Sequence, residues 1–139
     1  MESKPIKVLV AEDKDYLRRT LGRIFSDARY AVKLAADGAE ALTMFQGAQQ
    51  TNGGIDILFT DVEMPNMNGV VLAETIRREH PKSTCPIYFV TGGIPSLSRA
   101  EAALYNQLLA DGRVQGVIAK PFLPKELWST VDKHYPQSL

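Results

Sequence analysis

Acidic side chains follow directly on two short apolar runs of the chain, at positions suited to binding a divalent cation. Glu12 and Asp13 come after the run 6–11, and Asp61 comes after the run 55–60. Carboxylate oxygens without a neighbouring His or Cys are ligands typical of Mg2+, with Mn2+ or Ca2+ as alternatives, rather than of zinc. We therefore take these three acids as candidate ligands of Mg2+, or of Mn2+, if the fold brings them together.

Two later apolar runs end in groups that can bind an oxyanion. Thr91 ends the fourth run with a hydroxyl, and Lys120 ends the fifth with an ammonium group. Two carboxylates about 4 Å apart repel each other by roughly 4 kcal/mol at an effective dielectric of 20. Three converging acids thus require a cation, a neighbouring ammonium group or protonation. Lys120 alone offsets only part of their charge.

Short apolar runs, most of them rich in β-branched or aromatic residues, predict strands separated by helices. Ser98 with Glu101 three residues later forms a capping box for the fourth helix. Pro124 begins the last helix. The pair His80-Pro81 ends the third helix, because proline disfavours helix in the residue before it. The five predicted strands are 6–11, 30–35, 55–60, 87–91 and 116–120.

This alternation predicts one α/β domain of the (βα)5 type, with helices on both faces of a doubly wound, five-stranded parallel sheet. The flavodoxin-like strand order 2-1-3-4-5 makes the first and third strands neighbours. Functional groups of open parallel sheets collect beyond the carboxyl ends of the strands. Glu12, Asp13 and Asp61 are therefore expected to converge there.

Composition excludes several classes of protein. The 139 residues carry 16 Lys and Arg against 16 Asp and Glu, so a basic surface for nucleic acid is not expected. No apolar run approaches the roughly 20 residues of a membrane span, and no secretory signal precedes residue 6, so we expect a cytoplasmic protein without membrane contact. The single cysteine, Cys85, excludes an internal disulfide and a cysteine-based zinc site.

These motifs together resemble the receiver domain of response regulators in two-component signalling. Each piece alone is common, but five pieces in the right order, each at a strand end, are specific, and the resemblance covers essentially the whole chain. The matching pieces are VLVAED at 8–13, DGAEA at 37–41, DVEMPNMNG at 61–69, TG at 91–92 and KPF at 120–122.

The resemblance implies a role for each group at the strand ends. Asp61 would be the phosphoacceptor, with Mg2+ bound by Asp13, Asp61, Glu12 (directly or through water) and the backbone carbonyl of Glu63. The Thr91 hydroxyl and the ammonium group of the fifth strand, at Lys120, would each bind a phosphoryl oxygen. The bond before the following proline is typically cis in this family.

The same resemblance implies the partners. The phosphodonor would be a sensor histidine kinase or a histidine phosphotransfer protein. An unknown downstream protein would bind the face formed by helix 4, strand 5 and helix 5. The chain would not be an enzyme beyond assisting its own phosphoryl transfer and autodephosphorylation. Residues 1–139 are expected to form a single receiver domain without an output domain, and Met1 favours a stand-alone or N-terminal domain over an excised one.

One position departs from the family pattern. Many receivers carry Tyr or Phe three residues before the strand 5 lysine, where this chain has Val117. A β-branched aliphatic side chain has no ring to swing inward. We therefore expect phosphorylation to move Thr91 and the Gly92-Gly93 loop, and to reach the output surface through the backbone and helix 4. Glu63 lies two residues after Asp61, at a position where side chains can influence the access of water to the phosphoryl group in this family.

Two rival classes remain at this stage. A Mg2+-dependent phosphohydrolase with an aspartyl nucleophile usually carries Asp-x-Asp on its first strand, whereas residues 61–63 read Asp-Val-Glu after the third predicted strand. A flavin-binding protein of the same fold needs a first loop rich in Ser, Thr and Gly, whereas Glu12 and Asp13 would repel a phosphate. Both rivals are less well supported than a receiver.

Overall fold

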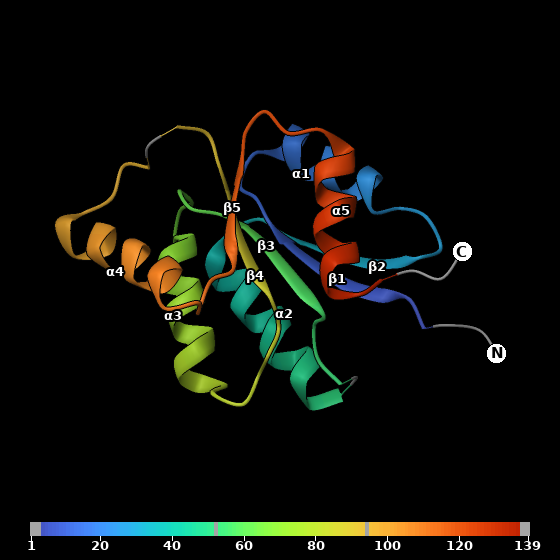
Figure 1. Ribbon diagram of the computed structural model, residues 1–139, viewed down its shortest axis with the longest axis horizontal. Helices are drawn as coiled ribbons and strands as arrows, with labels where there is room; N and C mark the ends of the chain where they lie inside the picture. Colours follow the sequence, from blue (N-terminus) through green and yellow to red (C-terminus); the bar gives the residue numbers. More distant parts are fainter. Residues whose placement is uncertain (1–3, 52, 94, 137–139) are drawn as a thin grey trace.

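The predicted parallel sheet is confirmed, with strand order β2-β1-β3-β4-β5 (Figure 1). The computed structural model describes residues 4–51, 53–93 and 95–136. All four strand pairs are parallel, and Ala11 of β1 lies in register with Ala35 of β2 and Thr60 of β3. The strands are β1 (Ile6–Ala11), β2 (Tyr30–Ala35), β3 (Ile57–Asp61), β4 (Ile87–Thr91) and β5 (Gly116–Ala119).

Helices cover both faces of the sheet, as a doubly wound fold requires (Figure 1). Helices α1 and α5 pack on one face through Leu21, Leu127 and Val131. Helices α2, α3 and α4 pack on the other, where Phe45 and Leu108 belong to a second apolar cluster. The helices are α1 (Asp15–Ile24), α2 (Gly38–Thr51), α3 (Gly69–Glu79), α4 (Arg99–Ala110) and α5 (Pro124–His134). No helix in the described ranges is long and apolar enough to cross a membrane.

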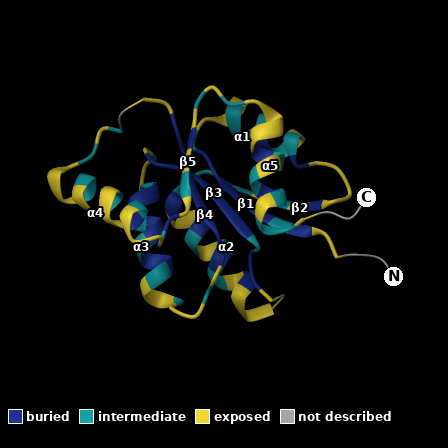
Figure 2. Ribbon diagram, viewed as in Figure 1, coloured by how far each residue is buried: buried dark blue, intermediate teal, exposed yellow. Residues whose placement is uncertain are grey.

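Burial follows the central strands (Figure 2). Every residue of β3 and β4 is buried, whereas the edge strands β2 and β5 alternate between covered and exposed positions. Strands covered on both faces read as continuous apolar runs, which is why the third run is nearly unbroken in sequence. The two central strands are thus a rigid base for the groups at their carboxyl ends.

Three predicted strand boundaries are wrong, and one of them is the end of the third strand, which lies at Asp61 instead of residue 60. The third strand begins at Ile57 instead of residue 55, because the carboxylate of Asp56 accepts the N–H of Lys7 (2.8 Å) where a strand carbonyl would otherwise bind. The fifth strand ends at Ala119, although the Lys120 N–H still donates to Thr91 O (3.0 Å). Pro121 has no N–H with which to continue the ladder.

The predicted helix ends are confirmed. Ser98 and Glu101 form the capping box of α4, with the Glu101 N–H bound to Ser98 Oγ at 3.1 Å. Pro124 is the first residue of α5, and α3 ends at Glu79, directly before His80. These ends follow from local backbone chemistry and so can be recognised in sequence.

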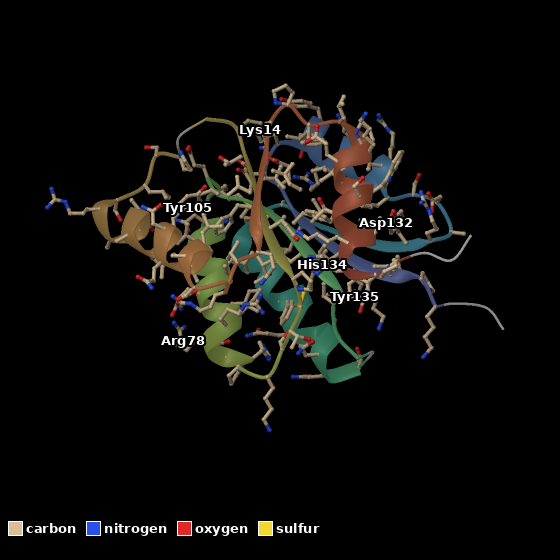
Figure 3. The ribbon with its side chains drawn as sticks, in the orientation of Figure 1. Lys14, Arg78, Tyr105, Asp132, His134 and Tyr135 are labelled. Atoms are coloured by element: carbon tan, nitrogen blue, oxygen red, sulfur yellow. The ribbon has the colours of Figure 1, made fainter. Side chains whose placement is uncertain are left out.

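The end of α5 is attached to the amino ends of the central strands by two aromatic residues. Tyr135 donates a hydrogen bond to Asp56 O (2.8 Å), and Tyr88 Oη lies 2.6 Å from His134 Nε2. His134 and Tyr135 are labelled in Figure 3. Burial and the nearby charge of Lys133 lower the pKa of His134. These contacts anchor the last helix at the sheet edge opposite to the acidic residues.

Candidate functional site

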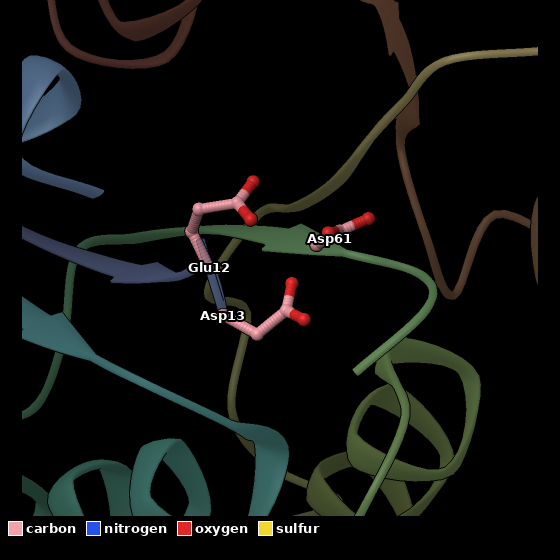
Figure 4. Close-up of side chains that lie close together, drawn as sticks. All are labelled: Glu12, Asp13 and Asp61. Atoms are coloured by element: carbon pink, nitrogen blue, oxygen red, sulfur yellow. The ribbon is translucent and has the colours of Figure 1, made fainter. Parts of the chain in front are cut away.

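The three acids meet where β1 and β3 end side by side. Glu12 and Asp13 follow β1, and Asp61 is the last residue of β3. Each contributes a carboxylate oxygen to a group in which these atoms all lie within 4.8 Å of one another. Figure 4 shows the three carboxylates projecting into the same space. The expected convergence of Glu12, Asp13 and Asp61 is therefore present in the structure.

Lys120 lies beside two of these acids. Its Nζ is 2.8 Å from Glu12 Oε1 and 3.4 Å from Asp61 Oδ2. Glu12 is only 1% exposed, and its carboxylate is bound by this ammonium group and by the Lys14 N–H, which donates to Glu12 Oε2 at 3.0 Å. Burial lowers the pKa of Lys120, but its contacts with Glu12 and Asp61 outweigh that effect and raise the pKa overall.

Asp61 titrates far from the usual range of an aspartate. Burial, and then the charge of Glu12, raise its pKa to about 6, against a smaller opposing effect of Lys120. The acid is thus ionised near neutral pH at the expense of folding stability. A cation bound at this position would relieve that cost, since it favours the charged form.

The donor set fits Mg2+. One oxygen of Asp13, Oδ1, is buried and has no hydrogen-bond partner among the described residues. A buried carboxylate oxygen without a partner is costly unless an ion or a water binds it. The acids offer only hard oxygen ligands, which Mg2+ and Mn2+ prefer. Asp13, Asp61 and Glu12 are therefore the groups that would bind the ion.

A pocket opens beside Asp61, bounded by the groups expected to contact a phosphoryl group. Thr91 and Gly92 reach it from the end of β4, and Lys120 reaches it from the end of β5. The Lys120–Pro121 bond is cis, as the resemblance implied. The residues lining the pocket are Lys14, Asp61, Glu63, Thr91, Gly92 and Lys120.

The loop after Asp61 has a backbone path that only a few residues allow. Asn66 has a positive φ of 67°, which Asn tolerates better than most residues. A Cβ at Gly69 would lie 2.1 Å from the carbonyl oxygen of Asp61, so glycine is required there. Asn68 caps α3 by accepting the Val71 N–H at 2.9 Å. The 61–69 motif thus returns the chain sharply into α3 and fixes the backbone next to Asp61.

Two contacts between this loop and the start of α4 escaped sequence reasoning. Glu63 Oε1 accepts the Ser96 N–H at 2.6 Å, and Asn68 donates to Glu101 Oε2 at 2.9 Å. The sequence pattern identifies Glu101 only as part of the α4 capping box. Both contacts join residues 33 positions apart, and no local pattern signals them. The Glu63 side chain therefore links the two loops that border the pocket.

The sequence matches the model of one protein family over most of its length. The model described as "Response regulator receiver domain" matches residues 8–132. The chain belongs to this family. Receiver domains are signalling switches of two-component systems that generally bind Mg2+ at an acidic pocket and receive their phosphoryl group from donors such as histidine kinases. In this chain, Glu12, Asp13 and Asp61 form an acidic cluster at the ends of β1 and β3.

Curated relatives of this receiver domain are longer proteins. The chain is 36% identical over 124 residues to the sensor kinase CckA of Brucella abortus (strain 2308), covering 89% of this chain and 12% of that protein. It is 36% identical over 129 residues to the probable transcriptional regulator ycf27 of Cyanophora paradoxa, covering 91% and 47% respectively. The chain thus spans less than half the length of either relative.

Solved structures agree with the assignment. The chemotaxis protein CheY4 of Vibrio cholerae, crystallised at low pH, has a TM-score of 0.71 and 28% identity, over 94% of this receiver domain and 98% of that chain. The receiver domain of the Francisella response regulator 1452 has a TM-score of 0.70 and 25% identity, over 94% and 96%. The whole fold is therefore shared, at low sequence identity.

The raised pKa of Asp61 predicts an unusual dependence of stability on pH. In metal-free protein, the folded state binds a proton near pH 6 that the unfolded state binds only near pH 3.8, so this group stabilises folding as pH falls from 7.5 to 5. Allowing for solvent screening, we expect a gain of about 1 to 2 kcal/mol. Urea unfolding at both pH values measures it, with Asp61→Asn as the reference. An equal pH dependence of the two proteins would contradict this expectation.

Proposed function

We propose that this chain is a phosphorylation-controlled switch whose phosphoacceptor is Asp61. The observation that carries the proposal is the convergence of Glu12, Asp13 and Asp61 beside the ammonium group of Lys120. The phosphoryl group would come from a sensor histidine kinase or a histidine phosphotransfer protein. Residues 1–139 would act as one receiver domain in the cytoplasm, where such donors present their phosphohistidine.

Asp61 supplies the nucleophile in this proposal. One of its carboxylate oxygens attacks phosphorus, and the bond from phosphorus to the donor's nitrogen breaks, so that the product is an acyl phosphate. Because the pKa of Asp61 is about 6, most of the carboxylate is ionised at neutral pH and ready to attack. Its fixed position at the end of a buried strand removes the need to order it before reaction.

The other groups stabilise charge on the phosphoryl oxygens. Glu12, Asp13, Asp61 and the carbonyl of Glu63 would bind Mg2+, with Mn2+ as an alternative. When bound, the ion supplies positive charge to the oxygens that become more negative in the transition state. Lys120 exchanges part of its contact with Asp61 for a phosphoryl oxygen, as a point charge. The Thr91 hydroxyl donates to another oxygen.

The downstream partner is proposed to bind the face formed by α4, β5 and α5. On this face Val117 is 44% exposed and lies in register with Phe89 of β4. The family aromatic is missing, but Tyr105 of α4 stacks on Phe89, with ring centroids 5.1 Å apart. This stack supports the expectation that a change near Thr91 reaches the surface through α4. An aspartyl-nucleophile phosphohydrolase is not favoured.

Incubation with acetyl phosphate tests the proposal. With Mg2+ present we expect intact mass spectrometry to show a single phosphoryl adduct, and peptide mapping to place it on Asp61. A chelator should reduce the rate of labelling by at least about 100-fold, since a bound divalent ion contributes several kcal/mol to such a transfer. An adduct on another residue, or steady release of phosphate at many turnovers per minute, would contradict a switch and favour a phosphohydrolase.

A further inference from the structure

Arg18 reaches back from α1 to the turn that carries two of the three acids. Its Nη1 donates to Glu12 O at 2.9 Å and to Asp13 O at 3.4 Å. Its Nη2 is paired with the carboxylate of Asp15, one turn away on the same helix. The Arg18 side chain is only 21% exposed, so it is held along the turn rather than extended into solvent.

On the side of β1 the turn is held by the Glu12 N–H, which donates to Ala35 O at 3.0 Å, whereas the side toward α1 has less support. Lys14 is the N-cap of α1, but its side chain makes no capping hydrogen bond. Glu12 is oriented through its carboxylate, which is bound by Lys120 and by the Lys14 N–H. Asp13 has no comparable support, because its Oδ1 has no partner among the described residues. The direction of the Asp13 side chain therefore depends on the backbone that Arg18 holds.

We propose that Arg18 is a positioning residue for the divalent-cation site. By binding the carbonyl groups of Glu12 and Asp13, it holds their peptide units so that both carboxylates face Asp61 before any ion arrives. This inference rests on the proposed function, because it assigns a residue to the same metal site. A preorganised site binds more tightly, since less ordering of ligands accompanies binding.

Electrostatics makes the opposite prediction. Removing a positive charge near a cation site should strengthen cation binding, because one source of repulsion is lost. Loss of positioning should weaken binding, by about 10-fold for an outer group that orients metal ligands. The sign of the change therefore separates the two effects. A purely structural role in capping α1 would alter unfolding without changing metal affinity.

The experiment measures Mn2+ binding to the full chain by electron paramagnetic resonance, for wild type, Arg18→Met, Arg18→Lys and Arg19→Met. Arg19 is exposed on the same helix and is the matched control. We expect about 10-fold weaker binding for Arg18→Met. Arg18→Lys should weaken binding less than Arg18→Met, because the lysine ammonium group can still bind one of the two carbonyls. Arg19→Met should bind as wild type does.

Amide exchange in metal-free protein gives a second readout. The Lys14 N–H, which is bound to Glu12 Oε2, should exchange faster in both Arg18 variants than in Arg19→Met. Unchanged or tighter Mn2+ binding by Arg18→Met overturns the inference and leaves the proposed function standing. Wild-type protein that does not bind Mn2+ overturns both. If Arg18→Met does not fold, Arg18→Lys decides, and wild-type affinity in that variant overturns the inference.

Discussion

Replacing Asp61 by asparagine is expected to abolish the acyl phosphate. An amide oxygen is a poor nucleophile, and among the described residues no other carboxylate both lines the pocket and lies within 4 Å of the Lys120 ammonium group. The adduct formed with acetyl phosphate and Mg2+ should fall to the background of the uncatalysed reaction. Intact mass spectrometry of both proteins after equal incubation measures the effect.

The control for this substitution is Asp37→Asn. Asp37 also follows a strand at the carboxyl edge of the sheet, but it is half-buried and bound to Asn66 and to the Glu40 N–H. This variant should be labelled at close to the wild-type rate. A persistent adduct in Asp61→Asn, or equal losses in the two variants, would contradict Asp61 as the phosphoacceptor.

Replacing Lys120 by methionine is expected to destabilise the metal-free protein by about 3 kcal/mol at pH 7.5, because loss of one partner leaves buried charges uncompensated. Glu12 and Asp61 would then face each other and the adjacent Asp13 without an ammonium group. The pKa of Asp61 should rise above 6 in this variant, because Lys120 lowers it in the wild-type protein. Urea unfolding in the presence of a chelator measures the change.

Two treatments that restore stability would identify electrostatic repulsion between the acids as the cause of the destabilisation of Lys120→Met. Saturating Mg2+ and a decrease to pH 5 should each restore part of the stability of Lys120→Met, by binding the acids or by protonating Asp61. The control Lys125→Met removes an exposed lysine from the first turn of α5 and should change stability by less than about 0.5 kcal/mol. A loss that neither Mg2+ nor acid reduces would instead indicate lost packing by the lysine stem.

Local chemistry explains why the fold was largely predictable. Each apolar run became a strand, and the cap at Ser98 and the proline at 124 marked helix starts. The strand boundaries at 55 and 120 were wrong because the first depends on the Asp56 side chain, which binds the N–H of Lys7 in β1, and the second on the missing N–H of Pro121. Neither influence appears in the apolar character of the run itself.

Contacts between distant elements were outside the reach of sequence reasoning. Arg77 illustrates this, because its guanidinium donates to the carbonyls of Arg113, Ser83 and Cys85 and so joins α3 to segments before β4 and β5. The link from Glu63 to Ser96 is of the same kind. Such contacts depend on rotamers and on loops that meet only after folding, so no spacing in the chain reports them.

The sequence by itself determined that the acids lie at one edge of the sheet, because they follow strands that run parallel. Only the tertiary structure decided how their charges are distributed. Lys120 binds Glu12 and Asp61, while the Oδ1 of Asp13 is left without a hydrogen-bond partner among the described residues. Topology follows from the order of elements along the chain, whereas charge pairing depends on distances of a few ångströms between side chains that only the packed molecule sets.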